Sequence, residues 1–262
     1  MEKLKSFVIT LKRTPERLEQ FYNLNPTAKN QGIEPIYGID GQEIDEILRP
    51  SKLIKLEALQ TWSKGAIGAA LSHLYCWRHA IKSQKTCLIL EDDAILSEGW
   101  HKTTLEATLE IKDYFDIIFL GWNINTALKA ATLEGIETTS LFSPPFPSNE
   151  QIKALINSND KRKACKLLHC YGLSSYIISP TGAEKLIQLA TPLRTEIVKL
   201  GRGLPNIESI HIDALLNNYY GSCRSFVIYP PLVLTKNTPE TSLTKPRSEP
   251  ENFGRVKPAN ET

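Results

Sequence analysis

The feature that most constrains the fold of this chain is a pair of short apolar runs that stop abruptly. Cys87 to Leu90 (CLIL) ends at the acidic triplet Glu91-Asp92-Asp93, and Asp116 to Leu120 (DIIFL) ends at Gly121. Apolar runs without alternation are typical of strands buried on both faces, which occur in parallel sheets covered by helices. The sequence therefore predicts an α/β fold, with a mixed, mainly parallel sheet flanked by helices.

Helix signals alternate with the strand signals. Ser6 to Leu11 predicts a first strand, and Thr14-Pro15-Glu16 predicts a helix start directly after it, with Thr14 as the N-cap. Apolar residues spaced by four, three, three and four positions predict a helix over residues 65–82; they are Ile67, Leu71, Leu74, Trp77 and Ile81.

Weaker signals complete the pattern. A strand over residues 34–39 should end in a turn in which Gly41 takes a positive φ. Two further strands are predicted at residues 174–179 and 225–229. Helices are predicted from Ser179-Pro180 to Leu189 and from Ser209 to Tyr219.

Composition and charge narrow the function classes. The 262 residues include 31 Lys and Arg against 29 Asp and Glu, so the net charge of +2 offers no electrostatic attraction to a nucleic acid. Five scattered cysteines without a C-x-x-C pair favour a reducing compartment. Because no secretory leader and no window approaching ~18 apolar residues is found, we expect a cytoplasmic protein without a transmembrane segment. Peripheral association with the inner face of the cytoplasmic membrane stays open.

Two segments differ from the regular pattern. Residues 123–170 contain three prolines between Ser143 and Pro147 and a polar stretch from Asn157 to Lys163, so we interpret them as a variable insertion or lid. Residues 236–262 are polar and proline-rich, which predicts a flexible tail. Residues 1–235 are predicted to form a single domain.

The acidic triplet is the first candidate site. Three adjacent carboxylates raise one another's pKa and destabilise the fold unless a cation compensates them. Because strand side chains alternate, Glu91 and Asp93 should point one way and Asp92 the other. Oxygen ligands with open positions suit Mg²⁺ or Mn²⁺, whose coordination is commonly completed by phosphate oxygens. The triplet alone fits a divalent metal site and a solvated acidic turn equally.

A stretch of small residues from Gly65 to Ala70 leads into Ser72 and His73. Small side chains on the first turns of a helix let a ligand or another backbone come close, and helix N-terminal amides favour anions. By itself the pattern favours tight packing of a helix on a sheet, with His73 in the core or at the surface.

Taken together, these segments resemble glycosyltransferase family 25, the bacterial lipopolysaccharide and lipooligosaccharide biosynthesis group related to collagen galactosyltransferase domains. Order and spacing match across most of residues 6–125 and more loosely across 171–234. The resemblance rests on Phe7-Val-Ile-Thr-Leu-Lys-Arg13 with Arg17, Gly38-Ile-Asp-Gly41, Gly65-Ala-Ile-Gly-Ala-Ala-Leu-Ser-His73 with Trp77, Leu88-Ile-Leu-Glu-Asp-Asp-Ala94, Phe119-Leu-Gly-Trp122, Tyr176-Ile-Ile-Ser179 before Gly182-Ala183, and Asp213 ahead of Tyr229-Pro-Pro-Leu-Val233.

The resemblance implies a GT-A-like (Rossmann-type) fold, with residues 6–125 as the nucleotide-sugar-binding half and 171–235 as the acceptor-side half. It implies a UDP-sugar donor, usually UDP-galactose, and a bound Mn²⁺ or Mg²⁺. Asp93 would be the direct metal ligand, with Glu91 as a second ligand nearer to the ribose or a metal-bound water. The residues that it places around the donor are Thr10, Leu11, Arg13, Arg17, Asp40, Gly68, Ser72, His73, Glu91 and Asp92.

Three further residues are candidates on the acceptor side. Asp213 is the candidate general base, since inverting transfer needs a carboxylate that takes the acceptor's proton. Its alternative role is a favourable charge in the first turn of a helix. His211 is a candidate late metal ligand, against the alternative of an exposed histidine without a role. Trp122 is a candidate platform for the acceptor sugar, against core packing.

The sequence therefore predicts an inverting, metal-dependent glycosyltransferase that moves a hexose, β-galactose from UDP-galactose, onto a lipopolysaccharide, a lipooligosaccharide or another glycan acceptor. Gly172-Leu-Ser-Ser-Tyr176 stands where the family commonly has Gly-Thr-His-Ala-Tyr, so any role of that histidine is absent or moved. Two alternatives stay open. A metal-dependent phosphoryl-transfer enzyme would need a P-loop that this chain lacks, whereas a non-catalytic nucleotide-sugar-binding protein would use the same acids.

Overall fold

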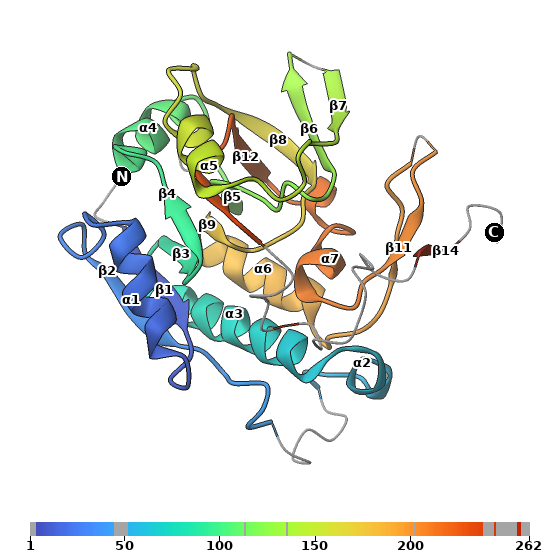
Figure 1. Ribbon diagram of the computed structural model, residues 1–262. Helices are drawn as coiled ribbons and strands as arrows, with labels where there is room; N and C mark the ends of the chain where they lie inside the picture. Colours follow the sequence, from blue (N-terminus) through green and yellow to red (C-terminus); the bar gives the residue numbers. More distant parts are fainter. Residues whose placement is uncertain are drawn as a thin grey trace.

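The computed structural model describes residues 4–44, 52–112, 114–134, 136–201, 203–237, 244 and 256–257. Within these residues, nine strands form a central sheet (Figure 1). They are β1 (Lys5–Thr10), β2 (Ile33–Tyr37), β3 (Cys87–Glu91), β5 (Ile117–Phe119), β6 (Leu128–Leu133), β7 (Ile136–Ser140), β8 (Lys163–His169), β9 (Ser175–Ile178) and β12 (Ser225–Tyr229). Their order across the sheet is β2-β1-β3-β9-β5-β12-β8-β6-β7.

The strand directions confirm a mixed, mainly parallel sheet. β1 pairs in parallel with β2 and β3, and β5 pairs in parallel with β12. β9 runs antiparallel to β3 and β5, β8 runs antiparallel to β12 and β6, and β7 runs antiparallel to β6. Six of the nine described strands therefore point the same way, and β7, β8 and β9 point the other way.

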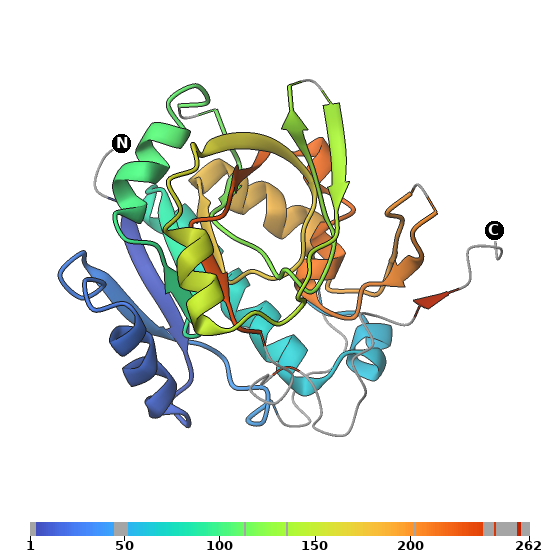
Figure 2. The ribbon, with the colours of Figure 1, turned by 45° about the horizontal axis from the view of Figure 1, so that its top comes forward.

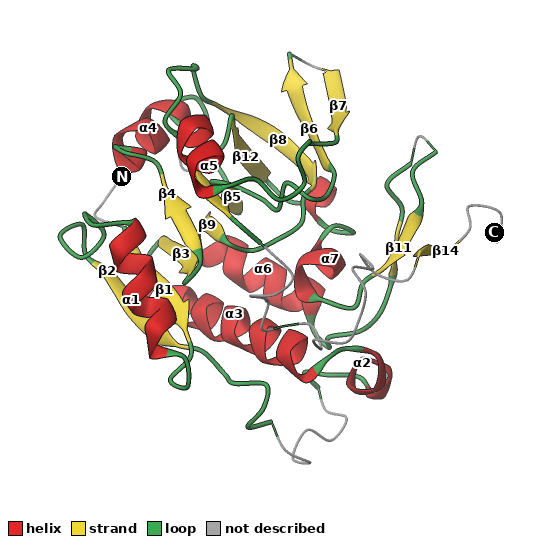
Figure 3. Cartoon of the chain, viewed as in Figure 1, coloured by secondary structure: helices red, strands yellow, loops and turns green. Residues whose placement is uncertain are grey.

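The two faces of the sheet build two hydrophobic cores. Along β3, Cys87 and Ile89 belong to one core and Leu88 and Leu90 to the other, which confirms a strand buried on both faces. α3 (Lys64–Ser83) and α6 (Pro180–Ala190) lie side by side over the first core (Figure 2). α1 (Pro15–Leu24) and α4 (Trp100–Ala107) cover the second. Figure 3 shows the resulting arrangement of helices around the strands.

The remaining elements lie around this α/β centre. They are the helices α2 (Leu56–Thr61), α5 (Asn149–Ile156) and α7 (Ile212–Leu216), the 3-10 helix η1 (Tyr220–Ser222), an antiparallel pair of β4 (Ala94–Leu96) with β13 (Val233–Thr235), and a small sheet of β10 (Ile197–Val198), β11 (Asn206–Glu208) and β14 (Val256–Lys257). Among the described helices, none combines the length and the apolar character needed to cross a bilayer.

The predicted helix starts are largely confirmed. α1 begins at Pro15 with Thr14 at the N-cap, although the Thr14 side chain accepts no hydrogen bond there. At α3, Ser63 Oγ accepts from the Ala66 N–H at 3.1 Å, and at α6, Ser179 Oγ accepts from the Gly182 N–H at 3.0 Å. These caps satisfy N–H groups that have no partner within the helix.

The prediction of a positive φ at Gly41 is wrong. Gly41 is not among the described glycines with positive φ. A Cβ atom on Gly41 would instead lie 2.2 Å from the carbonyl oxygen of Lys64, where α3 begins. Glycine is therefore required because the loop after β2 packs directly on the backbone of α3, and not because the turn is left-handed.

The helix predicted from Ser209 to Tyr219 is much shorter. α7 spans only Ile212–Leu216, and His211 occupies its N-cap. Ser209 does not cap this helix, because its Oγ accepts from the N–H of Glu196 at 2.8 Å and its own N–H donates to the Glu196 carbonyl. A tertiary pairing has replaced the expected cap.

Residues 123–170 are not a separate lid. They form β6, β7, α5 and β8, and β8 pairs with β12 inside the central sheet, where Cys165 and Leu167 are buried. The prolines and polar residues that suggested an insertion mark the connections between these elements. Most of the tail predicted for residues 236–262 lies outside the described residues.

Candidate active site

The predicted site residues converge on one cavity of about 580 Å³ at the carboxyl ends of β1 and β3. The start of α3, the loop that joins β8 to β9, and α7 complete its wall. The predicted residues that line it are Thr10, Leu11, Arg13, Arg17, Asp40, Ser72, His73, Glu91, Asp92, Asp93, His211 and Asp213. Open α/β sheets bind ligands at this end of their strands.

The acidic triplet is split between the two faces of the sheet. Glu91 faces α3, and its Oε1 lies 3.1 Å from His73 Nε2. Asp92 faces α1, and its Oδ1 accepts from Arg17 Nε at 2.8 Å and lies 2.6 Å from Arg17 Nη2. The predicted alternation of these two side chains is confirmed, because β3 extends through Glu91.

Asp93 departs from the predicted alternation. The chain turns after Glu91, so Asp93 Oδ2 lies 3.6 Å from Arg17 Nη2, on the side of Asp92. Its other oxygen, Oδ1, is buried without a hydrogen-bond partner among the described residues. Burial, followed by the charge of Glu91, raises the pKa of Asp93 to about 7, against the opposing charge of Arg17.

Asp93→Asn should make the unfolding of the chain less sensitive to pH. Because the pKa of Asp93 is about 7 in the folded chain and near 3.8 without these neighbours, its contribution to stability falls as pH rises from about 4 to about 7. Asparagine does not ionise. Relative to wild type, the variant should gain several degrees in melting temperature between pH 4 and pH 8, since about 1 kcal/mol corresponds to roughly 2–4 °C in a chain of this size.

Melting curves of both proteins at both pH values, recorded with a chelator present, test this prediction. Carboxyls away from the acidic triplet titrate equally in both proteins and cancel in the difference. A difference in melting temperature that stays constant across this range would contradict the raised pKa of Asp93.

Two arginines supply positive charge beside the acids. Burial lowers the pKa of Arg17, but the hydrogen bond to Asp92 and the surrounding carboxylates raise it above its ordinary value. Arg13 Nε donates to Asp40 Oδ2, and Asp40 Oδ1 accepts from the Gln42 N–H at 2.9 Å. The end of β1 and the loop after β2 are therefore joined at the rim of the cavity.

Ser72 and Gly68 hold that loop against α3. Ser72 Oγ accepts from the Ile39 N–H at 2.8 Å and donates to the Gly68 carbonyl at 2.7 Å. The prediction that Gly68 lines the cavity is wrong, since a Cβ there would lie 2.7 Å from the Gly41 nitrogen and the Ile39 oxygen. Gly68 positions the wall of the cavity through close backbone contact.

Asp213 lines the same cavity as the acidic triplet, from α7. Its Oδ2 accepts from the Gly172 N–H at 2.8 Å, and its Oδ1 accepts from the Ala214 N–H at 2.9 Å. Each carboxylate oxygen has a second lone pair. Asp213 therefore anchors the loop at Gly172 and can still accept a hydrogen bond from a ligand.

His211 lines the cavity, but the structure does not bring it together with Glu91 and Asp93 as a metal ligand. Among the described residues, no three His, Cys, Asp or Glu side chains are grouped to hold a metal ion. His211 instead occupies the N-cap of α7.

The interpretation of Trp122 as a sugar platform is wrong. Trp122 is 1% exposed and does not line the cavity. Its ring stacks on Tyr229 at 6.0 Å and 12°, and it also contacts Phe142. Trp122 is a core residue, because Phe142 and Tyr229 cover its ring.

Sequence reasoning missed several residues of the wall. They come from separate segments and include Gln42, Asn123, Asn125, Tyr171, Gly172 and Glu208. Of these, only Gly172 stood out in the sequence, as the first residue of the segment that departs from the family pattern; in the structure its φ is +85°, and a Cβ there would lie 2.4 Å from Asn123 Oδ1. A glycine at a loop position with both constraints marks a close approach of two wall segments.

The comparison with known families agrees with this geometry. Residues 3–200 match the model of glycosyltransferase family 25, described as lipopolysaccharide (LPS) biosynthesis proteins. The chain belongs to glycosyltransferase family 25. No curated protein matches the chain.

A family-25 glycosyltransferase takes a sugar donor and a glycan acceptor. The residues matched to the family include the end of β1, the acidic triplet and Gly172. His211 and Asp213 lie beyond residue 200, so their roles in this family-25 glycosyltransferase rest on the geometry of the cavity alone.

Proposed function

We propose that this family-25 glycosyltransferase transfers a hexose, β-galactose from UDP-galactose, with inversion and with a divalent metal ion. One observation carries the proposal: Glu91 and Asp93 meet Arg13 and Arg17 in a single cavity at the ends of β1 and β3. Its volume of about 580 Å³ falls within the roughly 300–1,000 Å³ of small-molecule sites. Acids and arginines together suit a diphosphate bound with its cation.

Glu91 and Asp93 would hold Mn²⁺ or Mg²⁺ together, because both line the cavity and the charge of Glu91 acts on Asp93. Asp93 Oδ1 is buried without a partner among the described residues, and Glu91 Oε1 lies beside His73 Nε2, which leaves its other oxygen for a cation. Such ions are commonly held by one or two carboxylates and by substrate phosphates, so a third protein ligand is not required. The ion would stabilise the negative charge that develops on the UDP leaving group.

The other donor contacts follow from position. Arg13 and Arg17 would bind the diphosphate oxygens, because both guanidinium groups line the cavity beside the acids. Thr10 Oγ1 is buried without a partner among the described residues, which makes it a hydrogen-bonding group for the nucleoside. Asp40, held by Gln42, would accept from the uracil or the ribose.

Asp213 would act as the general base on the acceptor side. It lines the cavity from another element than the acids, and its two backbone hydrogen bonds fix the carboxylate in place. The acceptor hydroxyl would donate its proton to Asp213 as its oxygen attacks the anomeric carbon. A lipopolysaccharide or lipooligosaccharide acceptor would place the enzyme, as a peripheral protein, at the inner face of the cytoplasmic membrane.

Nucleotide and metal should stabilise the chain together. With Mn²⁺ and UDP each at about 100 times its dissociation constant, the melting temperature should rise by several degrees, whereas Mn²⁺ alone should do less because the phosphates complete its coordination. Excess EDTA should abolish transfer. Full transfer in EDTA would remove the metal from the proposal, and the absence of UDP release from any UDP-sugar would favour a non-catalytic binding protein.

A further inference from the structure

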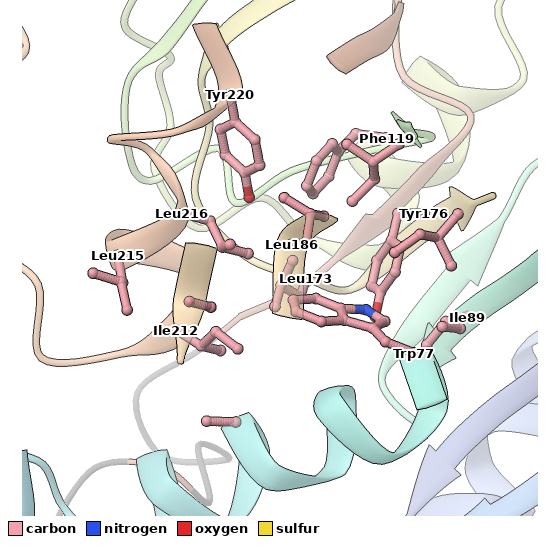
Figure 4. Close-up of a cluster of buried hydrophobic side chains, with 14 of the residues drawn as sticks. Trp77, Ile89, Phe119, Leu173, Tyr176, Leu186, Ile212, Leu215, Leu216 and Tyr220 are labelled. Carbon is pink, nitrogen blue, oxygen red and sulfur yellow. The ribbon is translucent and has the colours of Figure 1, made fainter. Parts of the chain in front are cut away.

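A chain of three hydrogen bonds leads from the core to Glu91. Trp77 Nε1 donates to Tyr176 Oη at 2.8 Å, Tyr176 Oη lies 2.9 Å from His73 Nδ1, and His73 Nε2 lies 3.1 Å from Glu91 Oε1. Trp77 and Tyr176 are 0% exposed and His73 is 2% exposed. Figure 4 shows the indole nitrogen of Trp77 beside the phenol oxygen of Tyr176. The chain ends at the cavity, where Glu91 is partly exposed.

The chemistry of the first group sets the direction of the whole chain. An indole N–H can only donate, so the oxygen of Tyr176 accepts there. The phenol hydrogen then needs an acceptor, and His73 Nδ1 is the one that the described residues offer. A neutral imidazole with an accepting Nδ1 carries its hydrogen on Nε2, which donates to Glu91.

The opposite tautomer is unfavourable in this environment. With the hydrogen on Nδ1, both Trp77 and His73 would donate to Tyr176, and the buried phenol hydrogen would have no acceptor among the described residues. The Nε2 lone pair would also face the Glu91 carboxylate. A buried donor without a partner costs more than a single hydrogen bond gains.

The three core residues are fixed by the fold. His73 and Trp77 are one helical turn apart on α3, and Tyr176 on β9 pairs with Ile89 of β3 and Phe119 of β5. β3 ends at Glu91, two residues after Ile89. The same elements therefore hold both ends of the hydrogen-bond chain.

We propose that Trp77 and Tyr176 are positioning residues of the donor site: they fix the His73 tautomer, and His73 Nε2–H then holds the Glu91 carboxylate in its donor-binding orientation. The effect on the donor rests on the proposed function, whereas the tautomer of His73 does not. Groups behind a ligand-binding side chain commonly set its tautomer and orientation in this way. Glu91 is thus oriented before a donor arrives, which reduces the cost of binding.

Tyr176→Phe tests the proposal, because it removes the hydroxyl and keeps the ring. The matched control is Tyr220→Phe: Tyr220 is equally buried in the same core, and its hydroxyl has no partner among the described residues. Nitrogen-15 NMR of histidine side chains in the chain without nucleotide should show His73 as the Nε2–H tautomer in wild type and in Tyr220→Phe. Tyr176→Phe should show a mixture of tautomers.

The second measurement is the affinity for UDP with Mn²⁺, by calorimetry, and the KM for UDP-galactose. Tyr176→Phe should lower the affinity for UDP and raise the KM for UDP-galactose, each about 3- to 10-fold, because one hydrogen bond contributes that much. The change in kcat should be smaller. Tyr220→Phe should stay within about twofold of wild type. A purely structural role of Tyr176 predicts the same small change in both variants.

Each outcome decides a separate point. A wild-type His73 with its hydrogen on Nδ1 overturns the proposal. The NMR spectrum that shows this is recorded on the wild-type chain, so it does not depend on the folding of a variant. Unchanged UDP affinity and KM in Tyr176→Phe overturn the positioning role. If Tyr176→Phe does not fold, Trp77→Phe removes the first donor and takes its place. A wild type that does not bind UDP contradicts the proposed function alone, since the tautomer is measured without nucleotide.

Discussion

Asp93→Asn should lower transfer roughly 10³-fold or more while the chain stays folded. The substitution keeps the size of the side chain but replaces a charged oxygen ligand by a neutral amide, so the stabilisation of the leaving diphosphate is lost. The raised pKa of Asp93 shows that its charge is a cost to the folded chain without a cation, so the variant should be at least as stable near pH 8. Product formation from UDP-galactose and the melting temperature are measured on one preparation.

Glu98→Gln is the matched control for this variant. Glu98 is an exposed acid five residues further along the chain and does not line the cavity. Its substitution should leave transfer within about twofold of wild type. An unfolded Asp93→Asn chain would show that Asp93 is structural, and near-normal transfer would show that it is not a ligand.

Asp213→Asn should lower transfer roughly 10²–10⁴-fold, the usual worth of general base catalysis, while the affinity for UDP with Mn²⁺ is retained. Asparagine keeps the shape of the side chain but cannot take a proton from the acceptor. It also keeps only one acceptor oxygen for the two N–H groups of Gly172 and Ala214, so some loss of stability, about 1–3 kcal/mol, should accompany the loss of transfer.

Asn217→Ala distinguishes a role of Asp213 as general base from a role as anchor of the loop at Gly172. Asn217 hydrogen-bonds both the N–H and the carbonyl of Cys170, so its loss loosens the loop before Gly172, yet Asn217 does not line the cavity. If Asp213 acts as a base, Asn217→Ala should keep transfer within about threefold of wild type. Equal losses in the two variants would identify Asp213 as a loop anchor, and loss of Mn²⁺ binding in Asp213→Asn would make it a ligand.

Local periodicity was enough to predict the centre of this fold. The strand around Ser6, the helix that contains Ile67 and Trp77, and the apolar strand before Glu91 all form where their patterns indicate. These patterns report burial of neighbouring residues on one or two faces of the same element, which is a property of the local sequence. The acidic triplet was predictable for the same reason, since it ends an apolar strand, whereas the other donor-side residues followed from the resemblance to family 25.

The loops and the acceptor side were not predictable in this way. Trp122 was a candidate to contact a sugar but packs in the core, because the side chains that bury it, Phe142 after β7 and Tyr229 at the end of β12, come from segments far along the chain. Gly41 and Gly68 serve a backbone contact between the loop after β2 and α3, which no local pattern encodes.

By itself, the sequence determined the main elements, the acidic triplet at the end of a buried strand, and the family to which these segments point. Only the tertiary structure decided which side chains face one another across the cavity. His73 meets Tyr176 from 103 residues away, and Asp213 meets Gly172 from 41 residues away. The first contact depends on the place of β9 between β3 and β5, and the second on the packing of α7 against the loop before β9. Strand order and helix packing both depend on long-range contacts that a local pattern does not specify.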